Sequence, residues 1–187
     1  MKVLTTVLLL CGLGFSQAGS NAQLAIRPNS PDNSEQRITK EVRHELVMLP
    51  YYSIFDDLEY SVNGSTVTLL GAVTNPTLKK GAENAVKRVE GVTQVNNQIK
   101  VLPPSPMDDQ IRRRVARAIY SQDGLYRYSM GAVPSIHIIV DNGHVTLKGV
   151  VDNQSDDTMA KMAANQVPGV FSVNDDLQIG NQNVAQK

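Results

Sequence analysis

Three histidines and one cysteine are the side chains of this chain that most readily bind metals or act as nucleophiles. His137 and His144 lie on two neighbouring predicted strands, whereas His44 lies in a predicted helix. A zinc site usually needs at least one further ligand, and the single cysteine, Cys11, lies in an N-terminal apolar run. The spacing therefore predicts no metal site, and we expect the protein to need no cofactor.

Pairs of neighbouring aspartates occur at positions 56–57, 108–109, 156–157 and 175–176. Adjacent residues point to opposite faces of a strand and lie about 100° apart on a helix, so such pairs do not converge on one substrate atom. They fit helix starts and loops better. The chain also lacks a G-x-S-x-G motif and, outside its N-terminal run, a glycine-rich loop that could bind phosphate. These features predict a protein that is not an enzyme.

A run of arginines is the strongest candidate for a binding function. It lies in the sequence DDQIRRRVARAIY, residues 108–120, which has helical periodicity. On a helical wheel, one arc carries the apolar residues Ile111, Val115, Ala118 and Ile119. The opposite arc carries Arg113, Arg114 and Arg117, with Arg112 and Ala116 at the border. The helix is therefore expected to have one apolar and one basic face.

This amphipathic pattern has two interpretations. The basic face could contact anionic lipid headgroups, where each cation near the surface contributes about 1 kcal/mol. Aromatic and apolar residues near the end of the helix could then lie at the membrane interface: Tyr120, Leu125, Tyr126, Tyr128 and Met130. Alternatively, the apolar arc is core, and the arginines form a solvated face that Asp108 and Asp109 partly balance. The helical pattern alone does not distinguish the two.

The overall composition argues against nucleic acid as a partner. The chain has 187 residues, enough for one or two small domains, and its 18 basic residues balance 18 acidic ones. This balance gives no bulk attraction to a polyanion. Tryptophan is absent and 5% of the residues are aromatic, so stacking on bases is poorly supported.

The N-terminus has the order of features that is typical of an export signal. A lysine precedes an apolar run over residues 3–15, which is too short to span a bilayer. Small residues follow in a pattern that signal peptidase accepts. We predict a signal peptide over residues 1–22, with cleavage after Ala22 or, as the second choice, after Ala18. Cys11 follows leucine rather than a small residue, so a lipid anchor is not expected.

The chain contains an internal repeat. The sequence VTLLGAV at residues 67–73 is matched 78 positions later by VTLKGVV at residues 145–151, and the same offset aligns about forty residues without a gap. Upstream the offset is 73, so five extra residues are expected in the second copy near residues 129–134. Agreement of this extent indicates a duplicated unit. Lys148 takes the position of Leu70, which suggests that this face of the second strand points outward in the second copy.

The sequence pattern of each copy predicts the order helix, strand, strand, helix, strand. The helices are expected at residues 35–48, 76–90, 107–121 and 154–167, and the last strands at residues 94–101 and 172–179. Tight turns at Asn63-Gly64 and Asn142-Gly143 would join the first two strands. A right-handed crossover makes the second and third strands parallel. The fold class is therefore α+β, with two units that each pack a three-stranded mixed sheet against two helices.

These units resemble tandem BON domains, a family named for bacterial OsmY and nodulation proteins. The resemblance rests on the hairpin pattern V-T-L-x-G-x-V, the alanine-bearing second helix and the final G-V-x-x-V-x-N strand. It covers residues 36–101 and 108–179, with a Pro-rich linker at 102–106 and a C-terminal tail at 180–187. We expect structural turn glycines at Gly64, Gly71, Gly91, Gly143, Gly149 and Gly169.

The resemblance implies a non-enzymatic protein that is exported to the periplasm and peripheral to a membrane. Family members are associated with phospholipid membranes, envelope integrity and osmotic stress, and in dual-BON lipoproteins the first helix of the second domain is linked to anionic lipid. Here that helix carries Arg113, Arg114, Arg117 and Tyr120, so anionic phospholipid is the expected partner. Two alternatives remain: a protein–protein adapter that uses sheet edges and the loop at 125–134, and a chaperone-like stress protein.

Overall fold

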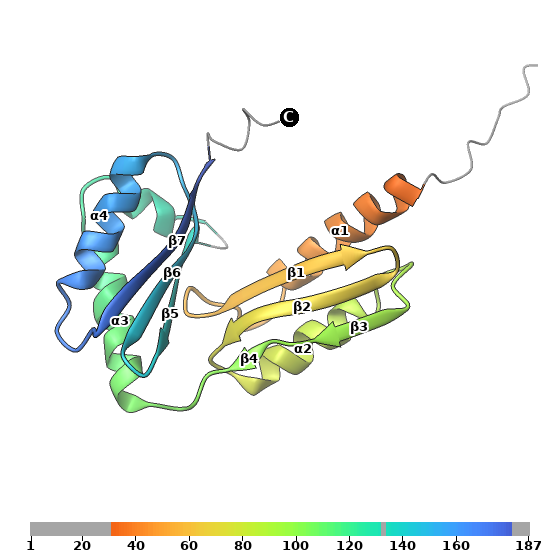
Figure 1. Ribbon diagram of the computed structural model, residues 1–187, viewed down its shortest axis with the longest axis horizontal. Coiled ribbons are helices and arrows are strands. Elements are labelled where there is room, and N and C mark those ends of the chain that lie inside the picture. The colour runs from red at the N-terminus through yellow and green to blue at the C-terminus, as the bar shows by residue number, and fades with distance from the viewer. Residues whose placement is uncertain (1–30, 132–133, 181–187) are drawn as a thin grey trace, which may run out of the picture.

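The computed structural model describes residues 31–131 and 134–180, which form two domains of the same design (Figure 1). The first contains α1 (Pro31–Val47), β1 (Asp57–Asn63), β2 (Thr66–Val73), α2 (Pro76–Val86), β3 (Gln94–Asn97) and β4 (Lys100–Val101). The second contains α3 (Pro106–Tyr120), the 3-10 helix η1 (Tyr126–Ser129), β5 (Ile136–Asp141), β6 (His144–Val151), α4 (Gln154–Asn165) and β7 (Ser172–Ile179). The predicted α+β fold is confirmed. The predicted signal peptide and all but the first residue of the predicted C-terminal tail lie outside the described residues.

Both sheets have the mixed strand order that the crossover rule predicts. In the first domain β2 pairs antiparallel with β1 and parallel with β3 and β4, and in the second domain β6 pairs in the same way with β5 and β7. β7 is continuous, whereas its counterpart is divided into β3 and β4, with residues 98–99 between them. The first sheet therefore has four strands rather than the predicted three.

Some helix ends differ from the prediction. α1 begins at Pro31, four residues before the predicted start, and proline suits the first turn of a helix. α2 ends at Val86 rather than at residue 90, because the amides of Arg88 and Val89 bond to carbonyls three residues back and the helix tightens into turns. α3 begins at Pro106, one residue before the predicted start, and the side chain of Ser105 caps it by accepting a hydrogen bond from the amide of the third helical residue.

The hairpin loop of the second domain is the predicted Asn142-Gly143 pair, with φ angles of 52° and 78°. The prediction for the first domain was wrong by one residue, because Asn63 still pairs with Thr66 and the loop is Gly64-Ser65. The offset of 78 places Gly64 opposite Asn142, so the repeat itself aligns the two loops correctly. A glycine with positive φ at the first loop position gives the alternative tight hairpin turn.

Two strand glycines are required by close backbone contact. A Cβ atom at Gly71 would lie 2.3 Å from the carbonyl oxygen of Asp57, and a Cβ atom at Gly149 would lie 1.9 Å from that of Ser135. Both glycines also have φ angles above 100°, which side-chain-bearing residues rarely adopt. They allow β2 and β6 to pass directly against the start of the preceding strand.

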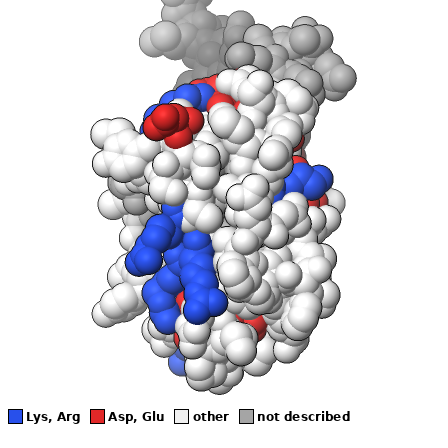
Figure 2. All heavy atoms as spheres, turned by 90° about the vertical axis from the view of Figure 1, so that its left-hand side faces the viewer, with Lys and Arg blue, Asp and Glu red and all other residues white. Residues whose placement is uncertain are grey.

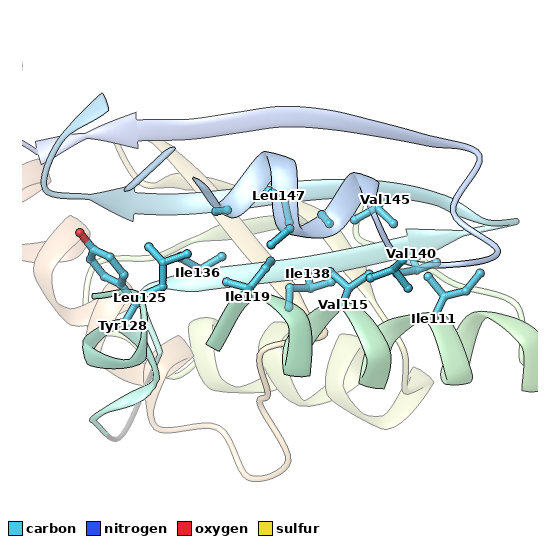
Figure 3. Close-up of a cluster of buried hydrophobic side chains, with 14 of the residues drawn as sticks. Ile111, Val115, Ile119, Leu125, Tyr128, Ile136, Ile138, Val140, Val145 and Leu147 are labelled. Atoms are coloured by element: carbon cyan, nitrogen blue, oxygen red, sulfur yellow. The ribbon is translucent and has the colours of Figure 1, made fainter. Parts of the chain in front are cut away.

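The core of the second domain lies between its helices and its sheet. Ile111, Val115 and Ile119 of α3 point toward the apolar side chains of the sheet (Figure 3). These sheet residues are Ile136, Ile138, Val140, Val145 and Leu147. The predicted apolar arc of α3 is therefore core, and burying each such side chain contributes about 1.5–3 kcal/mol. The first domain has an equivalent core around α1 and β2.

The two domains contact one another through residues 52–56, which belong to the connection between α1 and β1. The amide of Ile138 on β5 donates to the carbonyl of Ile54 at 2.7 Å, and Nδ1 of His137 lies 2.7 Å from the carbonyl oxygen of Asp56. Two side chains of this connection pack against the core of the second domain: Ile54 and Phe55. The two domains are therefore in direct contact.

Lys148 on β6 forms ion pairs with two carboxylates across this domain junction. Its Nζ lies 3.0 Å from Oδ2 of Asp57 and 2.5 Å from Oε1 of Glu59, both on β1. The expectation that this face of β6 points outward is therefore wrong, because it faces the first domain. A second ion pair, between Lys100 and Asp141, also joins the domains but is more exposed.

Candidate binding surface on α3

α3 separates its apolar and basic residues onto opposite faces. Pro106 occupies its first turn, and the exposed face carries Arg113, Arg114 and Arg117. Because the apolar arc is held by the core, the three arginines are directed away from the sheet. The structure thus brings together three of the four predicted lipid-binding residues on one exposed surface.

Arg112 does not belong to this surface. Its side chain is 5% exposed, donates to the carbonyl of Val140 at 2.7 Å and pairs with Asp109 at 2.5 Å. Its predicted position at the border of the two faces is therefore a buried position, because the guanidinium reaches the end of β5.

The two aspartates at the start of α3 do not neutralise the exposed arginines. Asp108 is 2% exposed and accepts hydrogen bonds from the amides of Asn142 and Gly143 at 3.1 and 2.9 Å. Asp109 is engaged by Arg112. Among the described residues, none of the three exposed arginines lies within ion-pair distance of a carboxylate, and Arg114 bonds only to a neighbouring glutamine. The positive charge of the three exposed arginines is therefore not balanced by an ion pair with a described carboxylate.

Tyr120, the fourth predicted lipid-binding residue, is half-buried and serves the fold. Its hydroxyl donates to the carbonyl of Ile136 at 2.8 Å, and burial raises the pKa of this hydroxyl to about 12. Leu125 and Tyr128 are buried in the core, so the expectation that they lie at a membrane interface is wrong. Tyr126 and Met130 are exposed.

A groove of about 390 Å³ runs beside the arginines, between α3 and the end of α4. Its lining combines two of the cations with small and apolar groups: Arg114, Arg117, Ala118, Ser121, Gln122, Ala163, Gln166, Val167 and Pro168. No carboxylate lines it. Such a groove could accept an anionic group with adjoining apolar atoms.

The equivalent groove in the first domain has a lining of mixed charge, with three carboxylates beside two arginines. Its volume is about 270 Å³, and it is lined by Arg37, Glu41, Glu45, Arg88, Val89 and Glu90. The repeat offsets place Glu41 opposite Arg114, and Glu90 opposite Pro168. Sequence reasoning missed these grooves, although aligning the two copies would have shown the change of charge. The second-domain groove, which has no carboxylate in its lining, is therefore the more favourable of the two for an anion.

Figure 2 shows the face of the molecule on which the second domain lies. The largest group of basic side chains there forms a continuous patch, and most of the surface around this patch is uncharged. The chain carries no net charge. Attraction to an anionic surface would therefore be local and would orient the molecule.

The structure separates the two histidines that the sequence places on neighbouring strands. His137 stands opposite Lys148, and His144 stands opposite Asp141, so the two histidines are at different ends of the hairpin. No group of three metal-ligating side chains occurs in residues 31–131 and 134–180. No described helix combines the length and apolar character needed to cross a membrane.

Comparison with known families gives two matches, both to the family described as BON domain. They cover residues 34–103 and 107–181. The osmotically-inducible protein Y of Escherichia coli (strain K12) is 30% identical over 125 residues. This match covers 65% of the chain and 61% of that protein, so the chain spans less than two thirds of the relative's length.

Solved structures give weaker similarities. Two structures of CdsD, a structural protein of the type III secretion system of Chlamydia trachomatis, match with a TM-score of 0.30 and 12% identity. The first, a C-terminal domain, covers 75% of this chain and 96% of its own, and the second covers 79% and 95%.

Proposed function

Because the chain belongs to the BON domain family and carries two copies of that domain, we propose that it is a non-enzymatic envelope protein that binds anionic phospholipid. Export to the periplasm and peripheral contact with a membrane are part of the proposal. The similarity to an osmotically-inducible protein supports a role in envelope integrity under osmotic stress.

One observation carries the proposal: three exposed arginines on α3 without a carboxylate partner. Arg113, Arg114 and Arg117 lie on one face, while the nearby acids are engaged elsewhere. Each cation near an anionic membrane contributes about 1 kcal/mol, so together they supply about 3 kcal/mol, or a factor of about 100 in affinity. This attraction is screened as the Debye length falls from about 10 Å at 0.1 M salt to 3 Å at 1 M.

Vesicle co-sedimentation tests the proposal. The wild-type protein is expected to sediment with phosphatidylglycerol-containing vesicles, to release them as salt rises, and to ignore purely zwitterionic vesicles. The triple variant R113E/R114E/R117E is expected to lose binding, because the repulsion of three carboxylates replaces the attraction.

A matched control uses the first domain. The variant R37E/K40E/R43E changes the same total charge at exposed positions of α1, and it should retain most of the binding. Equal losses in the two triple variants would show a nonspecific charge effect and contradict a site on α3. Undiminished binding of the α3 variant would also contradict it. Circular dichroism checks that both variants remain folded.

A further inference from the structure

Phe171 is an exposed aromatic side chain beside the basic surface. It immediately precedes β7, and 79% of the residue is exposed, the largest fraction among the large apolar residues that the structure describes. An isolated exposed apolar side chain is ordinary on a protein surface. Phe171 differs because the structure fixes its ring and because the sister domain shows that the fold does not need it.

The ring of Phe171 rests on the hairpin loop of the second domain. A Cβ atom at Gly143 would lie 2.5 Å from Cδ2 of Phe171, so the ring covers the bare glycine. The amide of Phe171 donates to the Gly143 carbonyl at 2.9 Å, and the ring of His144 lies 6.0 Å away between centroids. Phe171 is therefore packed on one side while most of its surface remains in water.

The first domain makes the same backbone contact with polar side chains. Thr93 is the counterpart of Phe171, and its amide donates to the carbonyl of Ser65 at 2.9 Å. The hydroxyls of Thr93 and Ser65 lie 2.8 Å apart. The same turn thus forms without an aromatic residue, so Phe171 is a feature of the second domain rather than a requirement of the fold.

Phe171 lies close to the arginine-lined groove. Pro168, which lines the groove together with Arg114 and Arg117, precedes it by three residues. Three residues span at most about 11 Å. Between them lies Gly169, where a Cβ atom would lie 3.6 Å from Cγ1 of Ile111, which is on the same helix as the arginines. The charge reversal and the Thr-to-Phe difference therefore fall in the same region of the second domain.

We propose that Phe171 is an apolar anchor that enters the interfacial region of an anionic phospholipid bilayer while the α3 arginines contact its headgroups. The inference rests on the proposed function and deepens it by adding a contact that salt does not screen. Aromatic side chains are favoured at the boundary between headgroups and hydrocarbon. The adjacent cations favour an anionic bilayer over an uncharged protein surface as the occupant. Burial of the phenyl ring accounts for about a tenfold to hundredfold change in affinity.

A single-tryptophan reporter tests this placement, because the natural chain has no tryptophan. In the full-length variant F171W, anionic vesicles should shift the emission to shorter wavelength, and brominated acyl chains should quench it. The matched variant T93W places the reporter at the equivalent turn of the first domain, where neither effect is expected. An F171W protein that sediments with vesicles while its emission stays that of an exposed indole would overturn the anchor alone.

Affinity measurements separate the anchor from the charges. F171T introduces the residue of the first domain, so it should fold normally and weaken vesicle binding at least about fivefold at every salt concentration. M48T, a change at an exposed methionine of the first domain, should leave binding unaltered. Failure of the wild type to sediment with any vesicle would overturn the proposed function and, with it, the anchor. An emission shift that grows with protein concentration in the absence of vesicles would indicate contact between two copies and overturn the anchor.

Discussion

Replacing Lys148 with methionine should loosen the junction between the two domains. Lys148 bonds to Asp57, whose side chain is 11% exposed, and to Glu59, whose side chain is 49% exposed. A charged hydrogen bond to a largely buried carboxylate contributes about 1.5–3 kcal/mol, and a half-exposed pair adds at most about 1 kcal/mol. We expect the variant K148M to lower the free energy of unfolding by about 2–3 kcal/mol and Tm by roughly 4–10 °C.

The pH dependence of this loss identifies its cause. Burial raises the pKa of Asp57, and the hydrogen bond and charge of Lys148 act in the opposite direction. In K148M the pKa of Asp57 therefore rises further, and the unpaired carboxylate is costly at neutral pH. As pH falls through this raised pKa, Asp57 becomes protonated and needs no ammonium partner. The difference in stability between wild type and variant should therefore shrink toward acidic pH.

Thermal and urea denaturation at pH 7 and near pH 4 measure both effects. The control is K100M, which removes the other ion pair between the domains. Lys100 and Asp141 are 60% and 31% exposed, so this change should cost less than about 1 kcal/mol. Equal effects of the two variants, or a K148M loss that does not depend on pH, would refute the reasoning.

Two further predictions concern a glycine and a tyrosine. G149A should destabilise the protein by at least about 3 kcal/mol or prevent folding, because its Cβ atom would collide with the carbonyl of Ser135. In the control G64A the new Cβ atom meets no atom within 4 Å, so this variant should cost about 1 kcal/mol from its positive φ alone. Urea denaturation and soluble yield compare the two variants, and equal losses of stability would contradict the steric argument. Burial raises the pKa of Tyr120 to about 12 against about 10 in the unfolded chain, so its contribution to stability is lost as pH rises from about 10 to 12. Y120F also removes the bond to Ile136 and should flatten this part of the stability profile, and an unchanged slope would count against the assigned pKa.

The repeat made most of the fold predictable. A single offset aligns both hairpins, and the spacing of Ile111, Val115 and Ile119 predicts the buried face of α3. The offset also pairs Gly64 with Asn142, where the local Asn-Gly signal misplaced the first turn by one residue. The alignment of the two copies therefore located the first turn better than the local Asn-Gly pair did, because both copies share one backbone fold and aligned residues occupy the same place in it.

The candidate site was only partly predictable. Periodicity places Arg113 on the outer face, but it cannot show that a long guanidinium such as that of Arg112 folds back to a strand carbonyl. Lys148 was placed on an outward face because the comparison with Leu70 treated each domain as an isolated unit, and the contact that covers Lys148 comes from the other domain. Phe171 was visible only as a mismatch with Thr93, which becomes meaningful once the turn that both residues share is known.

Hydrogen–deuterium exchange of the full-length protein with and without phosphatidylglycerol-containing vesicles tests the central claim most directly. We predict that vesicles slow exchange in α3 and in the segment that joins α4 to β7, and leave α1 and the matching turn of the first domain unchanged. Protection confined to the first domain, or spread equally over both copies, would contradict a membrane-binding site built on the arginines of α3.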